Sequence, residues 1–301
     1  MIGITGYSGF VGKNLTNYLH QHNLSIKQIN RQSIIQSNFS FLKDVEVLVH
    51  LSGKAHDLKN VSSFEEYYQV NTNLTIKLFD AFINSDAKIF ITLSSVKAVL
   101  DFSPTELTEE DQAIPITHYG KSKLLAEQYI LSKQIPHGKK VFILRPCMIH
   151  GPGNKGNLNL LYNIVSHGLP WPLGKYENSR SYLSVENLCF IIMELILRDD
   201  ISSGIYNVAD DIPISTNEVV RLIAESKGQK AKIIKLSKML INSLATIGDF
   251  LKLPINTERL IKLTENYIVS NTKIKSALGK QLPISSREGL LKTFKSFSSN
   301  A

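Results

Sequence analysis

The sequence contains few cysteines, a single tryptophan and no long apolar run. Cys147 and Cys189 are the only cysteines, and both lie in apolar stretches. This placement indicates buried thiols in a reducing compartment rather than a disulfide framework. The longest apolar run, 188–197, is interrupted by Glu194 and is too short to cross a bilayer. We therefore expect neither a disulfide-stapled scaffold nor a membrane-spanning protein.

Grouped metal ligands and nucleic-acid motifs are also missing. His50 and His56 have no cysteine partners at zinc-site spacing, so no metal is expected. The formal net charge is +8, but the lysines are dispersed, so nucleic acid is not an expected partner. With 301 residues and 43% hydrophobic content, the chain can form one large domain or two intimate ones. Because a strand is predicted from residue 1 onward, no signal peptide fits, and we expect a cytoplasmic protein.

A glycine-rich turn follows that first strand. Residues 1–5 predict the strand, and residues 10–20 carry apolar side chains at helical spacing. Glycine permits a tight bend between the two and lets the backbone approach a diphosphate closely. Free N–H groups at the start of the helix would hold that anion. A tight turn without ligand is the alternative, but the order of strand, turn and helix favours a dinucleotide. The residues expected to contact it are Gly6, Gly9, Phe10 and Val11.

The end of the second predicted strand, 25–29, should carry the residue that reads the adenosine ribose. An acidic residue there would favour NAD. The window 28–33 has no acid and contains Arg31. A guanidinium suits a 2′-phosphate, so NADP(H) is the favoured cofactor. Arg31 could equally be a solvated loop cation, which leaves NAD(H) open.

Tyr119 and Lys123 form a candidate catalytic pair. They are at positions i and i+4 of a predicted helix and so project from the same face. A nearby ammonium should lower the pKa of the phenol, which allows proton transfer at neutral pH. The pair follows a predicted strand, 88–93, that ends in Ser94 and Ser95. A serine hydroxyl at that point can hydrogen-bond a reacting oxygen.

The motifs Thr5-Gly6-x-x-Gly9-x-x-Gly12 and Tyr119-x-x-x-Lys123 together resemble the extended short-chain dehydrogenases/reductases, in the NAD-dependent epimerase/dehydratase family. The resemblance extends over nearly the whole chain. It implies a Rossmann-type doubly wound parallel sheet with a smaller carboxyl-terminal α/β substrate lobe. The implied dinucleotide-binding domain comprises 1–148 and 184–209, and the lobe comprises 149–183 and 210–301. A UDP-sugar substrate and a homodimer, built through the Tyr–Lys helix, are also implied.

The resemblance assigns further residues around the cofactor. The segment 45–56 is similar to the family's strand and loop beside the nicotinamide ribose, which places Leu51, Ser52 and Gly53 at that ribose. Asn71 takes the position of a residue that braces the loop over the cofactor. Ser95 is implied as the catalytic serine, with Ser94 as the alternative.

Substrate residues are implied in the same way. Trp171 lies in a segment similar to the strand that pairs with uracil, and Arg180 takes the position of the arginine that grips the diphosphate. Asn157 ends the glycine-rich loop, 150–157, that begins the substrate lobe. Ser95 and Lys97 complete the expected substrate set. The family's dehydratases carry an Asp–Glu pair where this chain has Val96 and Lys97, so dehydration is not expected.

Three functions remain open at this point. The favoured one is reduction at C4 of a UDP-4-keto-6-deoxy-N-acetylhexosamine, as in the bacterial branch of the family that serves surface polysaccharide synthesis. The second is a 4-epimerase of a UDP-hexose or UDP-N-acetylhexosamine, which keeps its NAD through the cycle. The third is a dinucleotide sensor without catalysis, which the intact Tyr119–Lys123 pair disfavours because a sensor needs no proton shuttle.

One late segment, 233–253, predicts an amphipathic helix. Its apolar residues at helical spacing are Leu236, Leu240, Leu244, Ile247 and Leu251, with lysines at both ends. Packing of this stripe on the substrate lobe is the favoured explanation. A helix lying in a membrane interface is the alternative.

Overall fold

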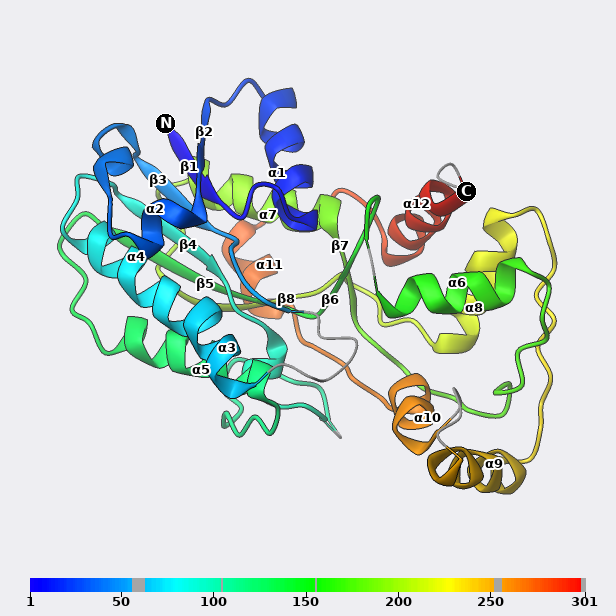
Figure 1. The fold of residues 1–301 in the computed structure, drawn as a ribbon. Helices are drawn as coiled ribbons and strands as arrows, with labels where there is room; N and C mark the ends of the chain where they lie inside the picture. Colours follow the sequence, from blue (N-terminus) through cyan, green and yellow to red (C-terminus); the bar gives the residue numbers. More distant parts are fainter. Residues whose placement is uncertain (56–62, 104, 155, 252–255, 299–301) are drawn as a thin grey trace.

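A parallel sheet organises the first part of the molecule. The computed structural model describes residues 1–55, 63–103, 105–154, 156–251 and 256–298. Within them, six strands pair in the order β2-β1-β3-β4-β5-β8, all parallel (Figure 1). Their bounds are β1 (Ile2–Thr5), β2 (Ile26–Ile29), β3 (Val47–His50), β4 (Ile89–Leu93), β5 (Lys140–Pro146) and β8 (Gly204–Val208). The predicted Rossmann-type fold is confirmed.

The central strands are buried on both faces. Every residue of β1 and of β3 is buried, which explains why their sequences are short, nearly continuous apolar runs. The chain passes from β1 to β2 on one side and then returns to β3 on the other. This reversal leaves a position between the carboxyl ends of β1 and β3 where ligands bind in open α/β sheets. The glycine turn follows β1, the segment 51–53 follows β3, and Ser94 and Ser95 follow β4, so these predicted segments lie at that edge.

Helices cover both faces of the sheet, as Figure 1 shows. One face is covered by α1 (Phe10–Gln21), α7 (Val185–Leu197) and α11 (Thr272–Leu278), whose apolar side chains share one core with β1 and β3. On the other face lie α2 (Arg31–Ile35), α3 (Phe64–Tyr67), α4 (Leu74–Ile83) and α5 (His118–Leu131). Phe79, Phe82 and Phe90 form a fully buried aromatic group there, and it fixes α4 on the sheet.

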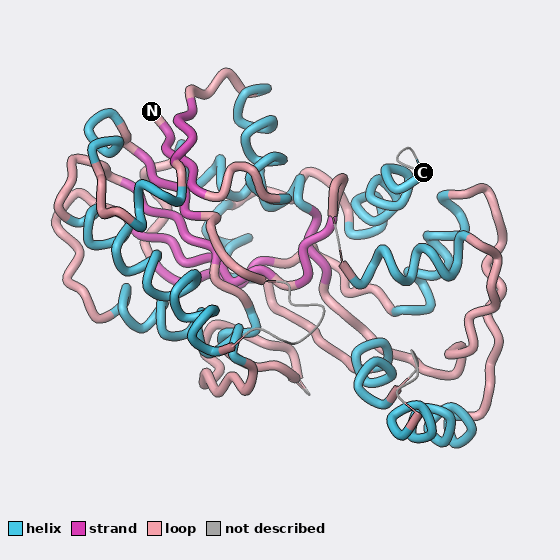
Figure 2. Tube along the Cα trace, viewed as in Figure 1, coloured by secondary structure: helices cyan, strands magenta, loops and turns pink. Residues whose placement is uncertain are grey.

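The second part of the molecule is built largely from helices and loops, as the colours of Figure 2 show. Its helices are α6 (Asn157–Ser166), α8 (Thr216–Ser226), α9 (Lys238–Phe250), α10 (Thr257–Thr264) and α12 (Ser286–Ser298). They share a second core that contains Leu161, Leu222 and Phe294. The strands β6 (Met148–His150) and β7 (Tyr182–Ser184) pair beside the main sheet. The predicted domain boundaries stay a prediction, and α11 packs with the first core rather than the second.

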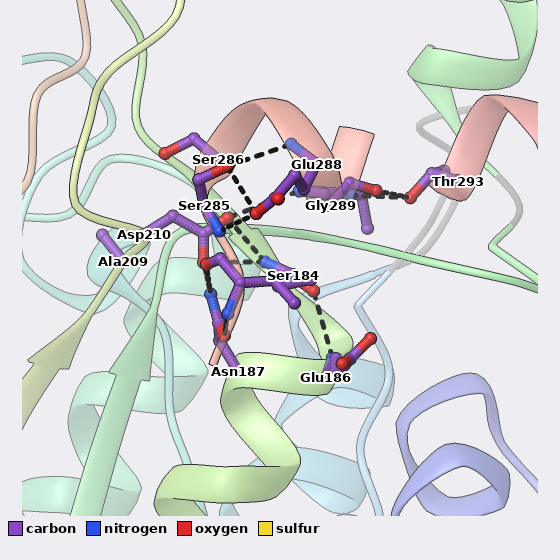
Figure 3. A network of polar contacts seen from close by, with 12 residues as sticks. Ser184, Glu186, Asn187, Ala209, Asp210, Ser285, Ser286, Glu288, Gly289 and Thr293 are labelled. Carbon is purple, nitrogen blue, oxygen red and sulfur yellow. Dashed lines mark hydrogen bonds and ion pairs between the residues drawn. The ribbon is translucent and has the colours of Figure 1, made fainter. Parts of the chain in front are cut away.

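A polar network joins the two parts of the molecule, and Figure 3 shows it from close by. The buried carboxylate of Asp210 accepts hydrogen bonds from the Ser184 backbone and from Asn187, which lies in the first turn of α7. The Asn187 side chain also bonds both backbone groups of Ile284, just before α12. Because each of these polar groups is satisfied, the junction is held by specific geometry and not by apolar contact alone.

The expected packing of the late amphipathic stripe is wrong. The helix covers Lys238–Phe250, and Ile241, Ala245 and Gly248 are the residues that it buries. Of the predicted stripe residues, Leu240, Leu244, Ile247 and Leu251 are exposed, whereas Leu236 lies before the helix and packs against the second core. Periodicity identified an apolar arc but could not tell which part of that arc meets the lobe. No helix in the described part of the chain is long and apolar enough to cross a membrane.

Candidate active site

The glycine turn brings the ends of β1 and β3 together. Gly6 adopts a φ of +68°, and a Cβ built on it would lie 2.7 Å from the Leu51 carbonyl carbon and the Ser52 nitrogen. A Cβ on Gly12 would lie 2.2 Å from the Gly6 oxygen. Any side chain at either position would therefore push the turn open. The sequence uses glycine there because two backbone segments meet without space between them.

The start of α1 offers unpaired backbone donors. Gly9 is the N-cap and provides no side-chain hydrogen bond, so the N–H groups of Phe10, Val11 and Gly12, which precede the first helical hydrogen bond from Lys13 to Gly9, have no partner within the helix. Phe10 also lies close to Gly151 in the loop after β6. Free N–H groups and the helix dipole suit a diphosphate, so the turn fits the dinucleotide that the sequence predicts.

Asn71 braces the loop that follows β3. Its Oδ1 accepts a hydrogen bond from the Lys54 N–H at 2.8 Å, and its Nδ2 donates to the Lys54 carbonyl at 3.0 Å. The same Nδ2 lies 3.0 Å from Ser122 Oγ on α5. Asn71 belongs to a π-helical turn, Tyr68–Asn73, a distortion that often marks functional sites. The loop with Leu51, Ser52 and Gly53 is thus tied directly to the helix that carries the catalytic candidates.

Lys123 lies between that loop and the end of β4. Its buried Nζ donates a hydrogen bond to the Leu93 carbonyl at 2.8 Å. A Cβ on Gly53 would lie 3.2 Å from the same Nζ, so the loop approaches the ammonium closely. Burial lowers the pKa of Lys123 to about 8, although the Glu127 carboxylate opposes this shift. The Lys123 ammonium therefore loses its proton more readily than that of an exposed lysine.

Tyr119 lies on α5, one helical turn before Lys123, and its side chain contacts that of Ser95. A hydrogen bond with the Ser95 side chain lowers the pKa of Tyr119, but burial has the larger effect and raises it. The expectation that Lys123 lowers the pKa of the phenol is therefore wrong for this structure. Desolvation of the phenolate outweighs every favourable contact. The Ser94 hydroxyl is buried without a hydrogen-bond partner among the described residues, but the contact with Tyr119 favours Ser95 as the reacting serine.

Two predicted substrate residues meet around a tyrosine that the sequence did not single out. The Lys97 ammonium lies 4.5 Å from the centre of the Tyr267 ring. The backbone of Arg180 pairs with that of Tyr267, and its guanidinium lies 3.4 Å from the Glu265 carboxylate. Burial lowers the pKa of Lys97. Tyr267 is distant from both cations in sequence and belongs to no motif, so only the folded chain reveals this grouping.

The other predicted contacts are placed less favourably. The Trp171 indole is buried in the second core and donates to Asn217 Oδ1 at 3.0 Å. Its backbone N–H and carbonyl are also paired, with Lys232 and Ile234. All three polar groups of Trp171 are thus occupied, which favours a structural role over contact with uracil. The side chain of Asn157, like the whole of His56, lies outside the described residues.

Arg31 lies just after β2, and its predicted contact with the cofactor stays a prediction. It is the first residue of α2, is exposed, and follows Asn30, whose side chain caps the helix by accepting from the Gln32 N–H. Its charge helps to lower the pKa of the buried His50 to about 3, although burial is the main cause. Both ring nitrogens of His50 bond hydroxyls, of Thr5 and Thr75. Among the residues with assigned positions, no cluster of three His, Cys, Asp or Glu side chains could hold a metal ion.

The chain is similar to known nucleotide-sugar enzymes over nearly its full length. A UDP-glucose 4-epimerase of Vibrio cholerae is 30% identical over 317 aligned residues, which cover 98% of this chain and 94% of that protein. The second relative is an N-acetyl-α-D-glucosaminyl-diphospho-ditrans,octacis-undecaprenol 4-epimerase of Escherichia coli O157:H7. It is 27% identical over an alignment that covers 90% of this chain and 83% of that protein.

The fold is shared with solved structures as well. A UDP-glucose 4-epimerase from Thermotoga maritima, solved with UDP-glucose, superimposes with a TM-score of 0.76 at 19% identity and covers 99% of each chain. Residues 2–209 match the NAD dependent epimerase/dehydratase family. With this match and the glycine turn, serine, tyrosine and lysine gathered at one edge of the sheet, the protein is an enzyme that belongs to the NAD-dependent epimerase/dehydratase family.

Proposed function

We propose that the protein catalyses 4-epimerisation of a UDP-sugar through transient oxidation at C4. The observation that carries the proposal is the grouping of Ser95, Tyr119 and Lys123 beside the glycine turn. This grouping supplies a proton-transfer group next to the expected position of a nicotinamide. The two epimerase relatives, one of them 30% identical over nearly the whole chain, support this reaction over the others.

The chemistry divides between the cofactor and the side chains. A bound nicotinamide supplies the hydride acceptor and donor. The Tyr119 oxygen takes the proton from the C4 hydroxyl as the sugar is oxidised and returns it to the 4-keto oxygen on reduction. Ser95 holds that same oxygen by a hydrogen bond, and Lys123 fixes the cofactor side of the site. Burial raises the pKa of Tyr119, and the positive charge of an oxidised nicotinamide would favour the phenolate that accepts the C4 hydroxyl proton.

The predicted substrate cations suit a nucleotide diphosphate. Arg180 and Lys97 both approach Tyr267 and lie at the same end of the sheet as the catalytic candidates. A planar guanidinium binds phosphate oxygens in a forked geometry. Its present partners, Glu265 and the Lys262 carbonyl, would orient the guanidinium toward the phosphates. We expect these cations to hold the diphosphate while Ser95 and Tyr119 act on the sugar.

A 4-reductase that uses NADPH is the second candidate, and Arg31 favours it. No carboxylate occupies the window 28–33, and Arg31 is its only charged side chain. A reductase must exchange its cofactor after each turnover, whereas an epimerase returns the hydride to its substrate. The specific substrate would then be a UDP-4-keto-6-deoxy-N-acetylhexosamine, as the sequence resemblance implies. A dinucleotide sensor without catalysis is disfavoured, because it would need no proton-transfer group and therefore no Ser–Tyr–Lys grouping.

The assembly and the cellular location are proposals of the same kind. A homodimer through α5 is supported by Leu125 and Leu131, apolar residues of that helix that are exposed in the single chain. A cytoplasmic enzyme is supported by the two cysteines, which are free and buried.

The decisive experiment separates the epimerase from the reductase. The purified protein is denatured, and the released dinucleotide is identified and counted. The native protein is then incubated with UDP-glucose and with UDP-N-acetylglucosamine, and the C4 epimer is measured by chromatography. An epimer formed with no net change in nicotinamide absorbance supports the proposal. Net oxidation of added NADPH by a 4-keto sugar, with no epimer from either UDP-sugar, would establish the reductase instead.

A further inference from the structure

The helix α9 presents an uncovered apolar face to solvent. The exposed fractions of the apolar residues on this face run from 48% for Leu244 to 88% for Phe250. The residues that make up this face are Met239, Leu240, Leu244, Ile247, Phe250 and Leu251, the last directly after the helix. Figure 1 shows α9 at the margin of the molecule beside α10. Exposed apolar side chains are ordinary when single, but a continuous group of six marks an interaction surface.

The geometry of α9 separates this face from the one that holds the helix in place. Leu240, Leu244, Ile247 and Leu251 follow the spacing i, i+4, i+7 and i+11 and so form one row. Ile241, Ala245 and Gly248 form a second row, which is buried. The narrow polar arc that remains carries Lys238, which lies over the Tyr176 ring, and Asn242, which accepts from the Tyr176 hydroxyl. The helix is thus attached by one apolar row and exposes another.

The chain that leads into α9 is strongly basic. Between residues 226 and 248 there are five lysines and no acidic residue. Lys230, Lys232 and Lys235 are exposed and form no ion pair with any residue that the structure describes. The acidic residues Asp249 on α9 and Glu258 on α10 already have partners. Asp249 accepts a hydrogen bond from the Thr257 backbone, and Glu258 pairs with Lys262. The surroundings of the apolar face therefore carry uncompensated positive charge.

We propose that α9 and the basic segment before it, 227–238, dock on an anionic lipid bilayer surface. Apolar side chains such as Phe250 and Ile247 enter the boundary between headgroups and acyl chains, while the lysines meet the negative headgroups. The combination is the pattern of a helix that lies in the membrane interface without crossing it. A neutral surface would contact the apolar side chains but would not attract the lysines, whereas an anionic surface does both.

A second copy of this chain fits the same face less well. A twofold contact brings the same patch of both subunits together. Two copies of the 227–238 segment would then face each other with like charge and no acid between them. An anionic bilayer satisfies both the apolar row and the lysines.

The helix α10, which packs against α9, contacts the predicted substrate arginine. Lys262 and Glu265, at the end of α10 and just after it, hold the Arg180 guanidinium through a backbone carbonyl and a carboxylate. The segment before α9 also pairs with the chain around Trp171 and Leu173. A surface bound at α9 would therefore lie next to the substrate lobe, not behind the nucleotide-binding sheet. The proposal does not depend on which C4 reaction the enzyme performs.

The test measures co-sedimentation of the full chain with vesicles. One vesicle preparation contains phosphatidylcholine alone, and the other contains equal parts phosphatidylcholine and phosphatidylglycerol. We expect binding to the anionic vesicles that falls at high salt. Two variants should each weaken binding to the anionic vesicles by at least about tenfold. The first removes apolar side chains that would enter the bilayer, and the second removes lysines that would meet the headgroups. They are Ile247→Asp with Phe250→Asp, and Lys230→Ser with Lys232→Ser and Lys235→Ser.

A matched control isolates the helix. Leu197→Asp with Ile212→Asp introduces the same charge at exposed apolar residues outside α9 and should bind as the wild type does. Equal binding to both lipid mixtures, or wild-type binding by the α9 variant, overturns the proposal. Absence of vesicle binding together with self-association that the α9 variant abolishes shows that a second copy covers the face, and also overturns it. All variants alter exposed side chains, so circular dichroism should show an unchanged fold.

Discussion

Arg145 on β5 and Glu127 on α5 form a forked ion pair that is almost completely buried. Arg145 Nη2 lies 2.6 Å from Glu127 Oε2, and Nε lies 3.0 Å from Oε1. The side chains are 6% and 2% exposed. Glu127 is one helical turn beyond Lys123 and raises the pKa of that lysine against the effect of burial. The pair thus fixes the helix that carries Tyr119 and Lys123 on the sheet.

Breaking this pair from one side should destabilise the protein strongly. Glu127→Gln leaves a buried guanidinium without its anion, which costs about 3–5 kcal/mol of unfolding free energy. Urea denaturation followed by circular dichroism measures the loss. The matched control is Glu258→Gln, which breaks an exposed pair with Lys262 and should cost about 1 kcal/mol or less. Similar losses of unfolding free energy for the two variants would show that the buried pair stabilises the protein no more than an exposed pair does.

The buried Lys123 should make stability depend on pH in the alkaline range. Its pKa is about 8 in the folded protein and 10.5 in the reference state, so the unfolded chain binds more protons between these values. Stability should therefore rise with pH in this window, by up to about 1.4 kcal/mol per pH unit. The comparison is with Lys123→Met, which should lack this increment. Parallel curves for both proteins from pH 8 to 10.5 would contradict the assignment.

Loss of the Tyr119 hydroxyl should remove turnover but not binding. Tyr119→Phe preserves the ring and deletes the proton-transfer group, so kcat should fall about a hundred- to ten-thousand-fold. Tyr129→Phe serves as the control, since Tyr129 also lies on α5 but its hydroxyl bonds Asp80 on α4. Near-normal turnover by Tyr119→Phe on the true substrate would exclude the catalytic role.

Arg180 should discriminate the two ligands. Arg180→Ala removes a forked phosphate donor, so binding of the UDP-sugar should weaken by about tenfold or more. Dinucleotide binding, which involves the opposite side of the site, should stay unchanged. Calorimetric titration of each ligand measures both effects, with Arg221→Ala as a surface control. Equal loss of both ligands would point to a structural role.

Arg31 should set the preference between the two dinucleotides. We expect the wild type to bind NADPH more tightly than NADH, and Arg31→Ala to narrow that preference by about 1.5–3 kcal/mol. Binding of NADH should change little, because it lacks the 2′-phosphate. Both cofactors are titrated at one salt concentration, with Lys27→Ala as a control on the preceding strand. A wild-type preference for NADH would remove the main support for the reductase.

Local sequence patterns predicted the main secondary-structure elements of this protein and the motifs that lie on them. The glycine turn, the apolar strands and the i, i+4 spacing of Tyr119 and Lys123 act over a few residues, so periodicity and backbone sterics suffice to predict them. The family resemblance extended this to a doubly wound parallel sheet, and the structure supplied the order of its strands. Apolar stretches also indicated that Cys147 and Cys189 are buried, but they could not show which face of an amphipathic helix is buried, because that depends on neighbours far away in the chain.

Tertiary structure decided the rest. Lys97 and Arg180 meet through Tyr267, and the predicted lowering of the Tyr119 pKa failed because the surrounding chain desolvates the phenol. Trp171 is enclosed by residues from α8 and the segment before α9, and the predicted apolar stripe of α9 turned outward. Each outcome arises from contacts between distant segments. A sequence pattern fixes which side chains share a face, whereas only long-range packing fixes what that face meets.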